Sequence, residues 1–277
     1  MDRLARRRSV DWTMKAISTG FALASIFVLA WILFTLLQRG LPAMGTHIFT
    51  EITLPPGQNG GLLNAIVGSL IQVGIALLIG APIGIMTGTF LAEAGRGSRF
   101  AEIVRFVNDI LLSAPSILIG LFVYQMIVVP TGGYSGFAGM IALAIIILPV
   151  VVRTTEDMLA LVPTSLREAA FALGAPMWKV ITFITWRAAR TGIVTGILLA
   201  LARAAGETAP LLFTSLGNNG WSVDPSQPMA SLPVAINTFA GSSFDDQVSL
   251  AWAGALLITV GVLALNILTR FVLAPKK

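Results

Sequence analysis

The sequence contains no cysteine and only one histidine, His47, and it is poor in charge. Without cysteine, a disulfide framework and thiolate metal sites are excluded. Only 11% of the 277 residues are charged and 56% are hydrophobic, whereas an ordinary soluble domain is about a quarter charged. A water-facing surface needs charge, and a lipid-facing surface does not tolerate it. The composition therefore predicts an integral membrane protein.

A nucleotide-binding loop is also missing. None of the four lysines follows a glycine, so the sequence has no Gly-x-x-x-x-Gly-Lys-Ser/Thr motif. Any use of ATP would require a separate ATPase subunit. The lone His47 lies in a loop, and no nucleophile or metal-ligand set accompanies it. We therefore expect a non-catalytic chain without a cofactor or metal of its own.

Long apolar segments are abundant, and six of them can cross a bilayer, whose core of about 30 Å requires about 20 helical residues. The first is too long for the h-region of a signal peptide. The third begins between 106 and 115, because Pro115 suits the first turn of a helix better than its interior. We predict an all-α polytopic protein with about six spans, at 17–37, 62–91, 106/115–129, 134–152, 191–213 and 248–271.

The predicted organisation has two parts. Residues 1–61 form an N-terminal tail, the first helix and an outer loop, and residues 62–277 form a five-helix core with an inner loop at 153–190. No internal repeat is evident, so the inverted repeats of many secondary carriers find no support.

Basic residues predict the orientation, because Lys and Arg accumulate in cytoplasmic loops. With the N-terminus inside, Arg39 alone falls in an outer loop and Arg203 lies within a helix. Both termini are therefore expected in the cytoplasm. The net charge of +5 is spread over short blocks and does not form the clustered basic face of a nucleic-acid site. The inner basic residues are Arg3, Arg6, Arg7, Arg8, Lys15, Arg96, Arg99, Arg105, Arg153, Arg167, Lys179, Arg187, Arg190, Arg270, Lys276 and Lys277.

Two further patterns predict local structure, one in the second span and one in a long loop. Gly80, Gly84 and Gly88 recur every four residues in the second span, a spacing that forms a groove for a closely packed helix. The outer loop 214–247 is rich in Gly, Pro, Asn and Ser and holds no basic residue. Within this loop, 229–239 predicts a short amphipathic helix lying on the membrane surface.

The inner loop carries the sequence Glu168-Ala169-Ala170, then Gly174, and Ile184 ten residues later. This pattern predicts a short helix with a small-residue face, ended by the glycine, and a second helix beginning near Pro176. Such a helix can sit in the groove of another protein; the alternative is that the loop packs on its own helix ends.

This pattern resembles the coupling ("EAA") loop of type I ABC importer permeases, which have the MetI-like architecture. The resemblance implies that Glu168, Ala169, Ala170 and Gly174 dock onto the ATPase. The family usually continues with Leu-Pro, where this chain has Trp186-Arg187. The geometry of the loop's exit therefore stays open.

A charged pair interrupts the fifth span. At 1.5 Å per residue, Arg203 would lie about 18 Å from a helix start at residue 191, near the bilayer midplane. Buried arginines at this depth usually face a bundle interior or a wet cavity. Arg203 and Glu207 share a helical face, with Gly196, Ala200, Gly206 and Pro210 on or beside it. The alternative is that the two charges only neutralise each other, although Arg before Glu is the poorer order.

The run 202–214, which includes Arg203, Gly206-Glu207-Thr208 and Pro210, resembles the PstA-type family of permeases in bacterial phosphate-specific transporters. Residues 60–70, 108–117 and 231–233 also look like this family. The resemblance implies phosphate as the substrate, with Arg203, Glu207, Thr208 and Asp109 along its pathway. For Asp109, a helix cap or a pair with a loop arginine is an alternative.

The same resemblance implies a bacterial inner-membrane complex. Its partners would be a second permease of the PstC type, a PstB-type ATPase dimer and an extracytoplasmic PstS-type phosphate-binding protein, together with lipid. Alternative functions are a sister PstC-type subunit, a permease for another oxyanion, or a secondary carrier. A secondary carrier would move its substrate without an ATPase.

Overall fold

The computed structural model describes residues 3–58, 60–95 and 97–273, and the regular structure of these residues is entirely helical. Five helices are long and apolar enough to cross a membrane, and a bent pair can supply a sixth crossing. These findings confirm the all-α fold with about six spans. The five helices are α1 (Arg3–Ala43), α3 (Leu63–Thr89), α7 (Gly136–Ala160), α10 (Trp186–Ala205) and α13 (Asp245–Leu273).

The bent pair consists of α4 (Arg99–Ser113) and the helical stretch Ser116–Thr131, which begins with α5 (Ser116–Val123), and the chain bends by 104° between them. The predicted third span covered both sides of this bend. The break falls at Pro115, which caps α5, because the residue before a proline disfavours the helical region. After α5 the chain continues through η2 (Tyr124–Val128), which is π-helical, into α6 (Val129–Thr131).

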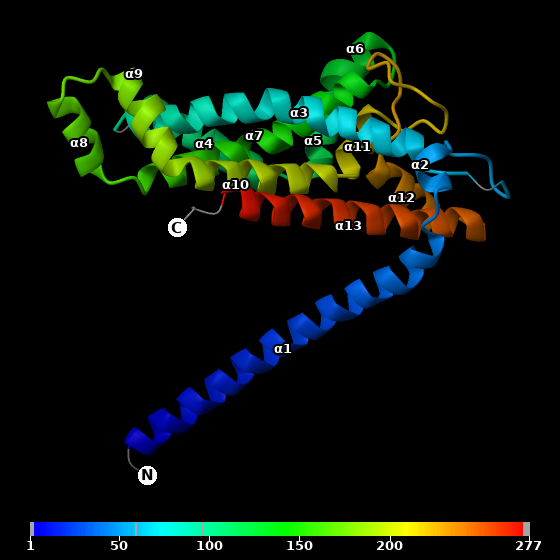
Figure 1. Ribbon diagram of the computed structural model, residues 1–277, viewed down its shortest axis with the longest axis horizontal. Helices are drawn as coiled ribbons and strands as arrows, with labels where there is room; N and C mark the ends of the chain where they lie inside the picture. Colours follow the sequence, from blue (N-terminus) through cyan, green and yellow to red (C-terminus); the bar gives the residue numbers. More distant parts are fainter. Residues whose placement is uncertain (1–2, 59, 96, 274–277) are drawn as a thin grey trace.

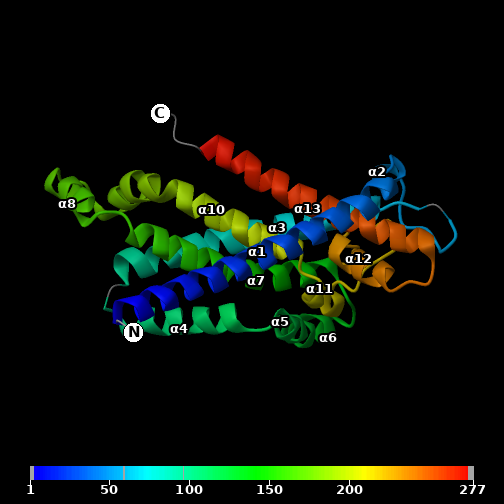
Figure 2. The ribbon, with the colours of Figure 1, turned by 90° about the horizontal axis from the view of Figure 1, so that it is seen from below.

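The helices α3, α7, α10 and α13 run along the long axis of the molecule (Figures 1 and 2). At one end lie α8 (Thr164–Ala172) and α9 (Met177–Lys179), and at the other lie α2 (His47–Thr50), α6 and α12 (Leu232–Ala240). The described start of α1 and the described end of α13 both lie toward the α8 end (Figure 1). The basic residues Arg96, Lys276 and Lys277 fall outside the described residues, as do the side chains of Arg3, Arg6 and Arg270.

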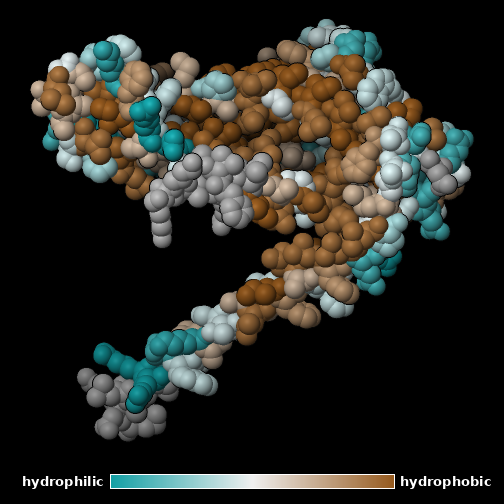
Figure 3. All heavy atoms as spheres, in the orientation of Figure 1, coloured by the Kyte–Doolittle hydropathy of each residue, from teal (hydrophilic) through white to brown (hydrophobic). Residues whose placement is uncertain are grey.

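Hydrophobic residues cover the flank of the bundle that is visible in Figure 3, and hydrophilic ones gather at its ends. This is the pattern of a membrane-spanning bundle. Most of α1 diverges from the other helices (Figure 1). It touches α13 near its own end, where Gly40 meets Leu256 and the Arg39 guanidinium lies 5.9 Å from the centre of the Trp252 ring.

The most extensive helix contact in the core joins α3 and α7, and three glycines of α3 allow their close approach. A Cβ atom on Gly84 would lie 2.8 Å from a Val151 side-chain atom, and one on Gly88 would lie 2.6 Å from the Val152 carbonyl oxygen. Gly80 faces Ile147 in the same way, at 3.0 Å. The predicted glycine groove is therefore confirmed.

The predicted fifth span, 191–213, is wrong in two respects. The helix begins earlier, because α9, the π-helical η3 (Val180–Thr185) and α10 follow one another without interruption. It also ends at Ala205, and a separate helix α11 (Ala209–Thr214) follows. Pro210 has no N–H to donate to the carbonyl four residues before it, so the helix cannot pass through Gly206 unchanged.

The helix predicted at 229–239 exists as α12, with its apolar side packed against the protein, and its placement at the membrane surface stays a prediction. It begins at Leu232 with Pro233 in its first turn. Leu232 and Phe239 are buried in a cluster with Leu250 and Ala253 of α13. Because its apolar side already faces α13, α12 belongs to the core of this end of the molecule.

Candidate functional site

The charged pair of the fifth span lies at the break between α10 and α11. Arg203 occupies the last turn of α10, and Glu207 follows in the non-helical connection. The distance from Arg203 Nε to Glu207 Oε1 is 3.6 Å, and the two side chains are 39% and 15% exposed. Among the described residues, no hydrogen bond engages the Arg203 guanidinium. Its N–H groups are therefore available to an acceptor from outside the chain.

The helix end also favours a positive group at this place, since a helix carries partial negative charge at its C-terminus. The helix of Arg203 does not begin at residue 191, as the estimate of depth assumed, because it is continuous from Met177; the depth of Arg203 in the bilayer stays a prediction. Arg203 lies at the end of a long helix and beside an interruption. An irregular backbone within a membrane is tolerated where protein or a wet cavity surrounds it.

Most of the small residues near this pair lie in close packing contacts. A Cβ atom on Gly196 would lie 2.6 Å from Cβ of Thr154 in α7, and Ala200 and Pro210 are buried. These three positions serve close packing and leave no open space. Gly206 alone among the four is exposed beside the pair.

The two interrupted spans meet close to this site. A Cβ atom on Gly120 of α5 would lie 2.6 Å from Cα of Pro210 in α11, so these helices pack backbone against backbone. Each of them directly follows an interruption, one at Pro115 and the other at 206–208. Many transporters build their substrate sites from discontinuous helices of this kind.

Asp109 forms an ion pair with an arginine, which was one of the alternatives to a place along the pathway. Its carboxylate lies 3.8 Å from Arg153 Nη1, and Arg153 Nε lies 3.3 Å from Asp157. Arg153 belongs to α7, which extends to Ala160, so the inner loop begins later than predicted. Within the described residues no ion pair or hydrogen bond joins Asp109 to Arg203, Glu207 or Thr208.

The coupling-loop pattern folds as predicted. The helix α8 ends at Ala172, Gly174 adopts the left-handed φ of +76°, and the next helix begins after Pro176. Glycine is favoured there because it has no Cβ to clash. The hairpin of α8 and α9 extends beyond the bundle (Figure 1). Its exposed side chains include Glu168 and Ala169, whereas Ala170 is buried.

Apolar side chains on this hairpin are also exposed, among them Leu173 at 89%. Phe171 and Trp178 are exposed beside it. Exposed apolar groups on the loop of a membrane protein indicate a contact surface for another protein.

Trp186 explains how the loop's exit is held without the family Leu-Pro. Its indole Nε1 donates to the Thr89 hydroxyl at the end of α3, at 3.0 Å. Its ring packs against a buried cluster that includes Leu159 and Ile193. The exit is thus tied to α3 by a side chain that has both a large apolar body and a donor.

Sequence reasoning missed a second buried polar contact of this loop. Arg167 forms an ion pair with Glu93, and the distance between Arg167 Nη2 and Glu93 Oε1 is 2.7 Å. The residues are 74 positions apart, so no local pattern connects them. The only sequence signal is one acid at the inner end of an apolar span.

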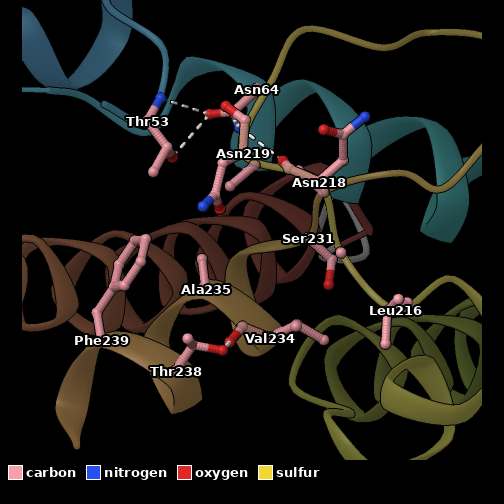
Figure 4. Close-up of a pocket in the computed structure, with 13 residues that line it drawn as sticks. Thr53, Asn64, Leu216, Asn218, Asn219, Ser231, Val234, Ala235, Thr238 and Phe239 are labelled. Atoms are coloured by element: carbon pink, nitrogen blue, oxygen red, sulfur yellow. Dashed lines mark hydrogen bonds between the residues drawn. The ribbon is translucent and has the colours of Figure 1, made fainter. Parts of the chain in front are cut away.

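A pocket lies at the opposite end of the molecule, near α12 (Figure 4). It has a volume of about 340 Å³ and no charged residue lines it. Asn64 of α3 accepts hydrogen bonds from Thr53 and donates to the carbonyls of Asn218 and Asn219. The pocket therefore lacks the cationic group that an anion site requires, and Asn64 acts there as a clip between two loops at this end of the molecule.

Comparison with known proteins gives the family. The family described as "Binding-protein-dependent transport system inner membrane component" matches residues 80–274. The Phosphate transport system permease protein PstA of Haemophilus influenzae is 54% identical over 98% of this chain and 96% of its own length. The chain belongs to the PstA family. As a member it is an inner-membrane permease subunit, which is the non-catalytic part of an ABC transporter.

Solved structures support the fold of this PstA-family chain. A bacterial ABC transporter involved in the import of the acidic polysaccharide alginate matches with a TM-score of 0.62 and covers 98% of both chains. The inward-facing MetNI methionine ABC transporter matches with a TM-score of 0.59, over 76% of this chain and 92% of that one. Because the sequence identities are only 16% and 19%, these two structures support the fold and nothing further. The type I, MetI-like architecture is confirmed.

Proposed function

We propose that this chain is one of two permease subunits of an ATP-driven phosphate importer. The observation that carries the proposal is the partly exposed guanidinium of Arg203, which has no hydrogen bond within the described chain and stands beside an interrupted span. High identity to a phosphate transport permease over nearly the whole chain supports phosphate as the anion.

The chemistry of the pair suits monohydrogen phosphate. The planar guanidinium of Arg203 presents parallel N–H donors that match two phosphate oxygens. The Glu207 carboxylate can accept the remaining proton of monohydrogen phosphate, and sulfate has no such proton at neutral pH. Glu207 also offsets part of the Arg203 charge, which keeps the anion weakly held, as conduction requires. Thr208 adds a hydroxyl next to the carboxylate.

The chain would perform this task with three kinds of partner. Membership in the family implies an ATPase and a second permease, and we assign these to the PstB and PstC types. The α8 end would face the cytoplasm, with both termini, and Glu168, Ala169 and Gly174 would contact the ATPase. Asp109 would line the inner exit, where Arg153 holds it. A PstS-type protein would deliver phosphate to the outer loops.

In the transport cycle, ATP binding closes the ATPase dimer and draws the coupling helices of the two permeases together. This movement opens the pathway to the outside, and hydrolysis returns it to the inside. The Arg203 site is reached from each side in turn.

Uptake into proteoliposomes that contain the complete complex tests this proposal. Phosphate, and neither sulfate nor molybdate, should stimulate ATP hydrolysis in the presence of the binding protein. Arg203→Gln should abolish uptake while the complex still assembles, and Arg203→Lys should retain a reduced rate, because it keeps the charge without the fork. Normal uptake by Arg203→Gln would refute the role of Arg203. Phosphate movement by the chain alone, without an ATPase, would favour a secondary carrier.

A further inference from the structure

The coupling hairpin is bound to the inner end of α3 by a buried ion pair outside the substrate site. Arg167 of α8 donates from Nε and Nη2 to the Glu93 carboxylate at 2.7–3.2 Å. Only 9% of the Arg167 side chain and 7% of the Glu93 side chain are exposed. Glu93 lies in η1 (Phe90–Ala94), the π-helical segment that continues α3. The pair therefore connects the coupling helix directly to a membrane span.

Arg167 also binds the backbone at the entrance to its own loop. Nη1 donates to the carbonyl of Val162 at 2.6 Å, and Nη2 donates to the carbonyl of Leu159 at 2.8 Å. Leu159 belongs to the last turn of α7. One guanidinium thus holds the inner ends of α3 and α7 and the start of α8. Arginine suits this position because its five donors form a rigid fork.

A buried ion pair is a costly way to attach a short helix, because loss of hydration offsets much of the attraction. Of the nine residues of α8, all of which the structure describes, only Arg167 and Ala170 are buried. The attachment of α8 to α3 therefore depends largely on this pair. Directional hydrogen bonds to a carboxylate fix the helix in position and angle, whereas an apolar contact allows it to slide.

We propose that Arg167 and Glu93 are positioning residues for energy coupling, which transmit the displacement of α8 to α3. The inference rests on the proposed function, in that it takes α8 as the helix that the ATPase engages. A displacement of η1 is carried along α3 and α7 together, because the glycines of α3 lock these helices side by side. Without the pair, α8 would be linked to the bundle through its chain connections to α7 and α9 and through its packing against η3.

A second arginine provides a matched control in the same region. Arg105 of α4 donates to Glu156 of α7 at 2.7 Å and to the carbonyl of Leu91 at 3.0 Å. It resembles Arg167 in binding both a carboxylate and a backbone carbonyl near η1. Among the described residues it forms no hydrogen bond or ion pair with α8, so its loss should loosen the inner end without uncoupling the hairpin.

The distance between α8 and α3 tests the proposal directly. The chain has no cysteine, so spin labels can be attached to cysteines introduced at Ser165 of α8 and Met86 of α3, which are both exposed. Double electron–electron resonance measures the distance between the two labels in the complex with its ATPase, first without nucleotide and then with trapped ATP. With the pair intact, the distance should change by less than about 2 Å, the scale of small helix shifts. In Arg167→Gln it should change by more, and in Arg105→Gln it should not.

The proposal is overturned if the distance stays constant in Arg167→Gln, or if it changes equally with the pair intact. Glu93→Gln keeps a carbonyl acceptor and is the milder variant; it should show the same change at smaller amplitude if Arg167→Gln does not fold. This measurement uses no phosphate, so it stands apart from a failure of the substrate assignment.

A second readout separates coupling from folding. In Arg167→Gln, the ATPase should remain bound and basal hydrolysis should persist, while stimulation by the loaded binding protein falls about tenfold, within the range of coupling between protein sites. Loss of the ATPase from the complex would show that the pair only builds the docking surface, which would contradict the proposal.

Discussion

Addition of one methyl group at Gly88 should destabilise the protein, although alanine is the better helix former. The substituted Cβ atom would lie 2.6 Å from the Val152 carbonyl oxygen and 2.7 Å from Thr155 Cβ. Both are well inside van der Waals contact, and a backbone oxygen cannot rotate away. Forced packing of this kind costs typically about 1–3 kcal/mol, whereas alanine gains up to about 1 kcal/mol of helix propensity. The net change should therefore be a loss of stability.

Gly74→Ala, in the same helix, is the matched control. Nothing lies within 4 Å of a Cβ atom at Gly74, so the variant should gain the propensity without the clash. The free energy of unfolding of both variants in mixed detergent micelles can be measured by denaturant titration followed through tryptophan fluorescence. Because the propensity gain is common to both variants, we expect Gly88→Ala to be less stable than Gly74→Ala by about 1–3 kcal/mol. If Gly88→Ala is as stable as the control, α3 and α7 do not interlock as described.

Three further predictions concern the two ends of the molecule. Asn64→Ala should cost about 1–3 kcal/mol and speed amide exchange in the outer loops, because it removes the clip between them; unchanged exchange would argue against the clip. Trp186→Phe keeps the apolar packing but loses the bond to Thr89, so thermal stability should fall by about 0.5–1.5 kcal/mol, and Thr89→Val should give a similar loss. Hydrogen bonds from the backbone and then the side chain of Ser226 lower the pKa of Asp224 below 3.8. The stabilisation they give is present above pH 3.8 and is lost as the pH falls through the lowered pKa, so exchange in this loop should rise there, and Asp224→Asn should remove the pH dependence.

Sequence patterns were sufficient for the features that depend on neighbours along the chain. The number of spans follows from apolar length, the groove of α3 from glycines four residues apart, and the hairpin of α8 and α9 from Gly174 and Pro176. Each of these signals acts within one or two helical turns. Their physical cause is local, so no knowledge of the packed structure is needed to interpret them.

The interruption at 206–208 was missed although its causes are visible in the sequence. The apolar run continues through Gly206 and Pro210, and a bilayer crossing requires about 20 helical residues, so the length of the run was given more weight than the proline. In the structure, α11 packs against α5 beside the interruption. This contact joins two separate segments of the chain, so neither segment alone reveals it. The start of the Arg203 helix was misjudged for a related reason, because it depends on how the hairpin joins α10.

The pair of Glu93 and Arg167 could not be predicted, since it joins residues 74 positions apart. The same holds for the bond between Trp186 and Thr89, 97 positions apart. In both cases an inner-loop side chain reaches the end of α3. Only the tertiary structure brings these residues together.

The central claim is that the guanidinium of Arg203 stands in a water-accessible passage used by the anion. The R203C variant tests it most directly, because the chain has no other cysteine. In the assembled complex, with cysteine-free partners, a negatively charged methanethiosulfonate should modify this position. Complete protection from the reagent in both the nucleotide-free and the ATP-trapped states would contradict the account.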